Sequence, residues 1–206
     1  METPDLIFDG PEDAPTVVLA HGAGAPMDSP FMNAMAAGLA AAGLRAARFE
    51  FPYMSRRRVG ERRPPDREPV LRAAWLAVID ALGGGERLVI GGKSMGGRFA
   101  SLVADEAGVR GLVCLGYPFH PPDKPERLRT AHLEDLRTPA LIVQGTRDPF
   151  GTREEVAAFD LSPSIRLAWM EDGDHSFKPR VSSGRTERGN LEAAVGEVVG
   201  FVRGVG

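Results

Sequence analysis

Three residues have the chemical types and the order in the chain that nucleophilic catalysis requires. Ser94 lies in Gly92-Lys93-Ser94-Met95-Gly96, a Gly-x-Ser-x-Gly pattern that follows an apolar run and precedes a helix-compatible segment. Asp148 and His175 each lie in a loop just beyond a later apolar run. A serine hydroxyl is a weak nucleophile until a histidine removes its proton, and a carboxylate holds that histidine in the correct tautomer. The sequence therefore predicts a triad with Ser94 as nucleophile, His175 as general base and acid, and Asp148 as orienting acid.

Each assignment has an alternative that the sequence leaves open. Ser94 could cap the helix that follows it, although capping needs no flanking glycines, whereas a tight turn needs them to avoid Cβ collisions. Asp172 or Asp174 could replace Asp148 as the acid, although loop neighbours of a histidine rarely point into the same site. His175 could be an ordinary surface residue. The shared position of all three groups beyond strand ends favours the triad.

A tetrahedral intermediate also needs two N–H donors for its oxyanion. The backbone N–H of Met95, at the predicted helix start, is the first. The second is predicted in the loop His21-Gly22-Ala23-Gly24-Ala25, with Ala23 as the first choice and Gly24 as the second. This loop could also be an ordinary turn or a phosphate cradle. It lacks the Gly-x-Gly-x-x-Gly and Walker spacings, so a nucleotide site is not expected.

Side chains that follow strand ends on one sheet edge are expected to line the substrate pocket, unless they belong to the core. The candidates are Met27, Tyr53, Met54, Tyr117, Phe119 and Phe150. His120 is expected to be an exposed loop residue, and His132 a surface residue. The stretch 56–69 is interpreted as a long loop whose arginines either are solvated or attract an anionic substrate. The stretch contains six arginines, and those considered for attracting a substrate are Arg56, Arg57, Arg58, Arg62 and Arg63.

Short apolar runs alternate with helical patterns along the whole chain. Strands are predicted over Leu6–Phe8, Thr16–Ala20, Leu44–Phe51, Leu88–Gly91, Arg110–Leu115, Ala140–Gln144 and Ile165–Met170. Helices are predicted over Pro30–Ala42, Glu68–Leu82, Met95–Ala107, Arg153–Phe159 and Arg185–Val202. Strands that are apolar on both faces are typical of parallel sheets covered on each side. The sequence therefore predicts one α/β domain over residues 1–206, with a doubly wound, mostly parallel sheet of about six to seven strands and no separate cap domain.

Composition excludes several classes of protein. The chain has 206 residues, and its 25 basic and 28 acidic side chains are too balanced for general nucleic-acid binding. No apolar run approaches the length of a membrane span, and the acidic start lacks the features of a signal peptide. We therefore expect a cytoplasmic protein, monomeric or homodimeric, with no nucleic-acid or membrane partner. The single cysteine, Cys114, lies in an apolar run and is expected to be buried.

Four motifs together resemble the motif set of the α/β-hydrolase superfamily, over nearly the whole chain. They are His21-Gly22-Ala23-Gly24, Gly92-Lys93-Ser94-Met95-Gly96, Gly145-Thr146-Arg147-Asp148 and Gly173-Asp174-His175. The sequence is most similar to small, lidless members, the dienelactone-hydrolase-like and NSL-complex-subunit-like groups. The resemblance implies an α/β-hydrolase fold with a serine nucleophile, no metal and no organic cofactor. Dienelactone hydrolases use a cysteine where Ser94 stands, so their substrate is not carried over.

The resemblance and the triad together predict a carboxylesterase-like or thioesterase-like serine hydrolase that acts on a small acyl substrate. Two alternatives use the same residues differently. One is a binding or scaffold protein that retains the fold without catalysis, because a fold never guarantees an activity. The other is a peptidase, an acyltransferase or a C–C hydrolase with the same triad.

Overall fold

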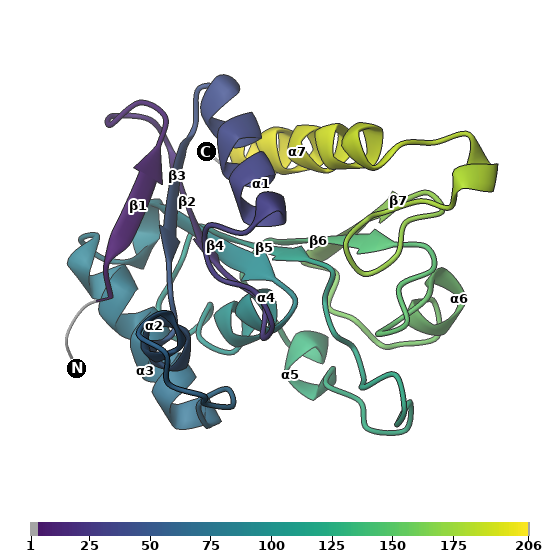
Figure 1. Cartoon of the computed structure of the whole chain (residues 1–206), viewed down its shortest axis with the longest axis horizontal. Helices are drawn as coiled ribbons and strands as arrows, with labels where there is room; N and C mark the ends of the chain where they lie inside the picture. The colour runs from purple at the N-terminus through teal and green to yellow at the C-terminus, as the bar shows by residue number, and fades with distance from the viewer. Residues whose placement is uncertain (1–3, 206) are drawn as a thin grey trace.

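A seven-stranded sheet forms the centre of the computed structural model, which describes residues 4–205 (Figure 1). The strands are β1 (Leu6–Asp9), β2 (Thr16–Ala20), β3 (Arg45–Phe49), β4 (Leu88–Lys93), β5 (Gly111–Leu115), β6 (Ala140–Gly145) and β7 (Ile165–Met170). The helices are α1 (Pro30–Ala41), α2 (Pro52–Arg58), α3 (Glu68–Ala81), α4 (Met95–Ser101), α5 (Ala131–Glu134), α6 (Arg153–Val156) and α7 (Glu187–Gly204). The spatial order is β1-β3-β2-β4-β5-β6-β7, and all neighbouring pairs are parallel except β1 with β3.

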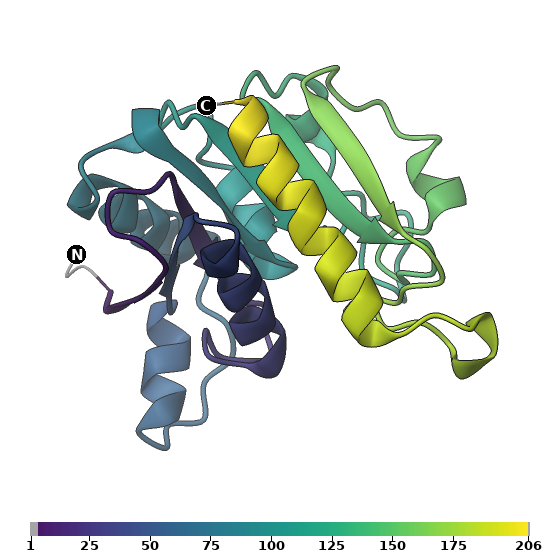
Figure 2. The same cartoon turned by 90° about the horizontal axis from the view of Figure 1, so that it is seen from above.

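Helices cover both faces of the sheet. Figures 1 and 2 show α1 and α7 lying side by side across one face, while α3 and α4 lie on the other. Successive strand residues alternate between these faces. In β2, Val17 and Leu19 pack in the core under α1 and α7, whereas Val18 and Ala20 pack in the core with α3 and α4. This two-sided burial confirms the predicted doubly wound α/β sheet, and no separate cap covers it within the described part of the chain.

The order of the strands reverses beside β2. The chain runs from β2 to β3 on one side and then crosses to β4 on the other, so β2 and β4 are neighbours, with Ala20 opposite Gly92. Their carboxyl ends meet at one edge, and the loops that leave them diverge there. Open α/β sheets bind ligands at such a switch point. The loop after residue 20 and the turn at Ser94 both lie at this switch point.

The predicted strands agree with the structure to within two residues at either end, but several predictions between them need correction. The helix predicted over Arg153–Phe159 ends at Val156. The helix predicted over Met95–Ala107 ends at Ser101, and turns follow it. The stretch 56–69 is not one long loop, because Arg56 to Arg58 form the end of α2 and Glu68 begins α3. Pro52 and Pro69 each lie in a first helical turn, where proline is favoured, and this is the signal for both starts. The short helix α5 was not predicted.

Two expectations from composition can be compared with the structure. Cys114 is buried, as expected, and its burial raises the pKa of the thiol. No helix within residues 4–205 has the length and apolarity needed to cross a membrane. Residues 1–3 of the acidic start, on which the predicted location partly depends, lie outside the described residues.

The close approach of α4 to β2 makes a testable prediction. Gly96→Ala should lower the free energy of unfolding by about 1–3 kcal/mol, because the added Cβ would lie 2.3 Å from the Ala20 carbonyl oxygen. Gly200→Ala is the control: it lies in α7 with open space around it, and should raise the free energy of unfolding by about 0.5–1 kcal/mol. Urea denaturation of the three proteins measures both effects. A Gly96→Ala protein as stable as the wild type would contradict the close approach.

Candidate active site

Ser94 occupies a strained turn between β4 and α4. Its backbone has φ 51° and ψ −114°, a conformation that non-glycine residues rarely adopt. The Ser94 N–H donates to the Leu115 carbonyl at 3.0 Å, which ties the turn to β5. The side chain makes no capping hydrogen bond to α4, so the structure does not support the alternative of a helix cap. The strained turn leaves the hydroxyl free for another role.

The glycines on either side of Ser94 are required by the backbone of β2. A Cβ at Gly92 would lie 2.1 Å from the Ala20 carbonyl oxygen, and one at Gly96 would lie 2.3 Å from the same atom. Real side chains do not tolerate such distances. The Gly-x-Ser-x-Gly pattern therefore follows from the packing of the turn against β2.

His175 and Asp148 form a hydrogen-bonded pair at the same sheet edge. The His175 Nδ1 lies 2.8 Å from the Asp148 Oδ2, and Asp148 is completely buried. A carboxylate accepts hydrogen bonds, so Nδ1 carries the proton and Nε2 is left as the basic nitrogen. The ring of Phe150 packs on the imidazole with centroids 4.4 Å apart. The imidazole is thus held in the tautomer that a general base needs.

The two alternative carboxylates face other partners. Asp172 pairs with Arg180 and with Arg147, and the hydrogen bond from Arg180 lowers the pKa of Asp172 to about 2. One carboxylate oxygen of Asp174 accepts two backbone N–H groups of its own loop, at 2.8 and 3.0 Å. Asp148 is accordingly the carboxylate that the structure brings to His175.

The loop that carries His175 is strained on both sides and anchored to α7. Asp172 has φ 54° and Phe177 has φ 68°, both in the left-handed region. The Asn190 side chain, from α7, donates to the Phe177 carbonyl at 2.8 Å and to the Glu171 carbonyl at 3.1 Å. Phe177 is itself completely buried. These contacts hold the loop that carries the imidazole.

Gln144, the penultimate residue of β6, orients the acid. Its amide nitrogen donates to the Asp148 Oδ2 at 3.0 Å, and its amide oxygen accepts the Tyr117 N–H at 2.7 Å. The other carboxylate oxygen of Asp148 accepts the Phe150 N–H at 2.9 Å. Sequence reasoning missed the role of Gln144. The signal was present, because a polar side chain at the end of a fully buried strand must find partners.

Lys93 places a buried ammonium group beside the imidazole. Its Nζ donates to the carbonyl of His175 and lies 5.3 Å from the centre of the Phe31 ring. Burial lowers the pKa of Lys93 from 10.5 to about 8, against the opposing attraction of Asp148. The residue before Ser94 thereby holds the backbone of the histidine loop.

The predicted oxyanion donors lie around the same pocket as Ser94. Met95 and Ala23 both line it, and neither backbone N–H has a protein acceptor among residues 4–205. His21 shapes the loop of Ala23: its Nδ1 lies 2.6 Å from the Gly22 carbonyl, and its Nε2 accepts the Phe51 N–H at 3.1 Å. Burial lowers the pKa of His21, which keeps it neutral as this bonding requires. Gly24, the second choice, is exposed and is not among the residues that line the pocket.

A pocket of about 350 Å³ opens beside Ser94. Its lining residues are Ala23, Pro65, Asp66, Leu71, Ser94, Met95, Arg98, Phe99, Pro118, Arg129 and Phe150. The predicted pocket residue Phe150 is among them. The two arginines were not predicted, because Arg98 lies within a helix and Arg129 ends a proline-rich loop, so neither follows a strand end directly.

The other aromatic and methionine candidates lie elsewhere, which corrects the predicted pocket. Tyr53, Tyr117 and Phe119 are completely buried, while Met27 and Met54 are nearly so, and none of these residues lines the pocket. These side chains pack in the buried interior, under the loops around the pocket, and not into the opening of the pocket. The Tyr53 hydroxyl donates to the Ala23 carbonyl at 3.0 Å and so supports the pocket from below.

The histidines and arginines that sequence reasoning treated as solvated are largely engaged. His120 is 3% exposed and lies 3.5 Å from a carboxylate oxygen of Glu155. His132 is half-buried, 2.8 Å from the Ser101 hydroxyl, and burial lowers its pKa to about 4. The predicted exposure of His120 was wrong, whereas His132 is partly exposed but has a hydrogen-bond partner.

Within the arginine-rich stretch, Arg58 pairs with Glu50 and Asp28, both at 2.7 Å. Arg57 lies over the ring of Tyr53, 5.0 Å from its centre. Arg63 pairs with Glu61. These contacts occupy part of the positive charge that could have attracted an anionic substrate.

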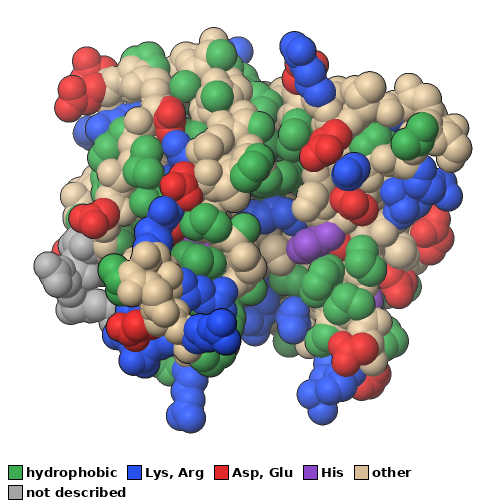
Figure 3. Space-filling view, in the orientation of Figure 1, with side chains coloured by type: hydrophobic (Ala, Val, Ile, Leu, Met, Phe, Trp, Pro, Cys, Tyr) green, Lys and Arg blue, Asp and Glu red, His purple; other side chains and the backbone are tan. Residues whose placement is uncertain are grey.

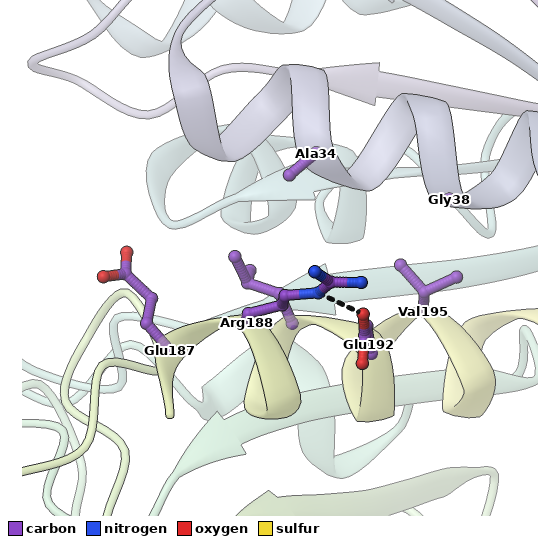
Figure 4. A pocket seen from close by; sticks show the side chains of 7 residues that line it. Ala34, Gly38, Glu187, Arg188, Glu192 and Val195 are labelled. Atoms are coloured by element: carbon purple, nitrogen blue, oxygen red, sulfur yellow. Dashed lines mark hydrogen bonds and ion pairs between the residues drawn. The ribbon is translucent and has the colours of Figure 1, made fainter. Parts of the chain in front are cut away.

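A larger cavity, of about 620 Å³, lies between α1 and α7 (Figure 4). It is lined by Ala34, Gly38, Glu187, Arg188, Leu191, Glu192 and Val195. Arg188 and Glu192, which form an ion pair, both line it, whereas Ser94, Asp148 and His175 do not. Within residues 4–205, no group of three His, Cys, Asp or Glu side chains is arranged to hold a metal ion.

Comparison with known proteins shows the family to which this fold belongs. Residues 13–203 match the protein family described as "Alpha/beta hydrolase domain", and the chain belongs to that family. It is an α/β-hydrolase. Over 139 residues it is 32% identical to a Rattus norvegicus protein named "Putative protein-lysine deacylase ABHD14B". That match covers 66% of this chain and 63% of the relative, so the chain spans less than two thirds of the relative's length.

Solved structures share the fold at low sequence identity. The dienelactone hydrolase of Anabaena variabilis superimposes with a TM-score of 0.72 at 23% identity, covering 97% of this chain and 91% of that one. XC6422 of Xanthomonas campestris, described as an α/β serine hydrolase without a lid, gives a TM-score of 0.69 at 20% identity, covering 94% and 88%. Est1E of Butyrivibrio proteoclasticus, with ferulic acid bound, gives 0.72 at 14% identity, covering 97% and 95%. The predicted resemblance to α/β-hydrolases is confirmed.

The buried ammonium of Lys93 makes a prediction about stability and pH. Below pH 8 the folded protein holds the ammonium charged in its buried site. Above pH 8 the folded state loses this proton, while the unfolded chain keeps it up to about pH 10.4, so stability should rise. Between pH 8 and 9.5 the free energy of unfolding of the wild type should increase relative to that of Lys93→Met by about 1.5 kcal/mol. Other titrating groups are common to both proteins and cancel. Urea denaturation at four pH values tests this, and parallel curves would contradict it.

Proposed function

We propose that this α/β-hydrolase is a serine hydrolase that cleaves an ester, thioester or related acyl substrate through an acyl-enzyme on Ser94. The observation that carries the proposal is the 2.8 Å hydrogen bond from His175 to the buried Asp148, at the sheet edge where Ser94 lines a pocket. A strained, uncapped serine at the same sheet edge as such a base is the arrangement that covalent acyl transfer requires.

The proposed reaction proceeds in two steps. The Ser94 Oγ attacks the carbonyl carbon while His175 Nε2 takes the hydroxyl proton, and the carbonyl oxygen becomes an oxyanion. The free N–H groups of Met95 and Ala23 donate to this oxyanion. The intermediate then collapses, the bond to the leaving alcohol or thiol breaks, and His175 returns the proton to it. A water molecule, deprotonated by His175, next attacks the acyl-enzyme, releases the acid and regenerates Ser94.

Asp148 acts on this reaction through His175. Its carboxylate holds the proton on Nδ1 and stabilises the imidazolium that forms in each step. Asp148 is completely buried and accepts a hydrogen bond from the Gln144 amide, and both features hold its carboxylate in position. Because water is excluded around it, the attraction between the carboxylate and the imidazolium is stronger than at a surface.

The name of the rat relative favours a second class of substrate, an acylated lysine side chain. An amide would use the same two steps, with an amine as the leaving group that takes the proton from His175. The relative's name supports this alternative for the matched 139 residues.

Covalent labelling tests the proposed nucleophile. A fluorophosphonate should add once to the wild type and not to Ser94→Ala, because the activated hydroxyl is the reacting group. Ser176→Ala is a matched control, since Ser176 is exposed next to His175 and its hydroxyl has no role in the proposal. Intact-protein mass spectrometry measures the adduct, and turnover of 4-nitrophenyl esters is followed alongside. A folded wild type that is neither labelled nor active would overturn the proposal.

Gln144→Met should lower kcat with little change in KM, because it removes the donor that orients Asp148 but leaves the pocket intact. We expect a loss of about 3- to 30-fold, well short of the about 10⁴-fold loss that Asp→Asn causes in a Ser-His-Asp triad. Steady-state kinetics of Gln144→Met and Asp148→Asn at one pH provide the comparison, with circular dichroism to establish folding. A kcat equal to that of the wild type would show that Gln144 has a packing role alone.

A further inference from the structure

Two arginine side chains line the pocket beside Ser94. Arg98 lies in α4, where its N–H donates to the Ser94 carbonyl at 3.0 Å, so it is one helical turn beyond the serine. Arg129 ends the loop that follows β5. Figure 3 shows Lys and Arg side chains gathered in the hollow between the α2 end of the molecule and the segment around α5.

Within residues 4–205, neither guanidinium has a carboxylate within hydrogen-bond distance. The carboxylate nearest to Arg98 belongs to Glu68, at 3.8 Å, and the Glu68 side chain is 47% exposed. The Nε of Arg98 is buried and has no acceptor among the described residues. Arg129 makes no ion pair within residues 4–205, and its Nη1 lies 3.4 Å from the Pro118 carbonyl. Burial, together with the charge of Arg98, lowers the pKa of Arg129.

The pocket holds one countercharge of its own. Asp66 lines it, but one of its carboxylate oxygens accepts the Tyr53 N–H at 2.8 Å, and no arginine lies within 4 Å of it in the described structure. The lining therefore carries two positive charges and one negative charge. Bringing two like charges together in a partly enclosed space is unfavourable unless another group offsets them.

Several other buried or half-buried arginines differ from this pair. Arg48 contacts Asp9 at 2.7 Å, Arg147 contacts Asp172 at 3.0 Å, and Arg153 contacts Glu171. Each has a carboxylate within hydrogen-bond distance. Arg98 and Arg129 lack such a partner, and both face a pocket that contains a candidate nucleophile.

We propose that Arg98 and Arg129 form a subsite for a carboxylate group of the substrate. The protein then acts on negatively charged esters, such as half-esters of short dicarboxylic acids. Guanidinium groups bind a carboxylate through paired, charge-assisted hydrogen bonds, which supply the acceptors that the pair lacks. The pocket, at about 350 Å³, has room for a short chain between Ser94 and the arginines. This inference rests on the proposed hydrolase function, but binding of the anion does not need turnover.

The first experiment compares esters that differ in charge. 4-Nitrophenyl hydrogen adipate carries a carboxylate on its acyl chain, and methyl 4-nitrophenyl adipate is the matched neutral ester. The hexanoate ester of 5-hydroxy-2-nitrobenzoate carries the carboxylate on the leaving group instead. The wild type should prefer one of the two anionic esters over the neutral one by about 10- to 100-fold in kcat/KM, as expected for a charged hydrogen-bond pair. Which ester is preferred tells whether the subsite holds the acyl or the alcohol part.

Variants assign the preference to the two arginines. Arg129→Gln and Arg98→Met should each reduce the ratio of kcat/KM for the preferred anionic ester to that for the neutral ester by about tenfold or more. Arg129→Lys should keep part of the ratio, because it keeps the charge but loses the paired geometry. Arg127→Gln is the control: it removes the same charge from an exposed position two residues away and should leave the ratio unchanged. If Arg98→Met does not fold, the Arg129 series still decides.

A binding measurement separates this inference from the proposed function. Calorimetry of Ser94→Ala with adipate should detect binding that is lost in Ser94→Ala with Arg129→Gln. If neutral esters are hydrolysed at least as well as both anionic ones and adipate does not bind, the anion subsite is wrong while the hydrolase proposal stands. If no ester is turned over and Ser94 is not labelled, the hydrolase proposal fails, and adipate binding alone then supports or overturns the subsite.

Discussion

The contact between the Ala20 carbonyl and the glycines around Ser94 is the constraint on which the site depends. The backbones of β2 and of the turn after β4 lie so close to each other that no Cβ fits between them. That contact stabilises the strained φ of Ser94, which an isolated turn would not keep. It also brings the loop of Ala23 next to Met95, so that one packing requirement positions the serine and both of its predicted oxyanion donors.

The opposite side of the site depends on buried polar groups with fixed partners. Asp148 is completely buried and accepts hydrogen bonds from His175, Gln144 and the Phe150 N–H, while the ammonium of Lys93 holds the carbonyl of His175. A buried charge without partners costs several kcal/mol, so every lost contact is expensive. This cost makes the network rigid, and rigidity is what a base needs to stay aligned with a nucleophile.

The sequence predicts the parts of this structure that follow from local pattern. Strands apolar on both faces specify a parallel sheet, and the carboxyl ends of such strands bring Ser94, Asp148 and His175 to one edge. The pocket does not follow from that logic. The sequence does not determine whether aromatic residues beyond strand ends, such as Tyr53 and Tyr117, face the solvent or the core. In the structure both are completely buried, because burying their large apolar surfaces is favourable.

The pocket is lined instead by residues whose positions depend on tertiary packing. The side chains proposed to select the substrate are therefore different from those proposed to carry out the reaction. Arg98 lies in α4, one helical turn beyond Ser94, so its charge stands at a fixed offset from the predicted nucleophile. Arg129 comes from a loop whose preceding residues are exposed and make few contacts. Substitutions in such a loop disturb little of the core. The proposed preference for an anionic substrate could therefore change at Arg129 without disturbing the network around Asp148, whereas a change at Arg98 also alters the packing of the helix that follows Ser94.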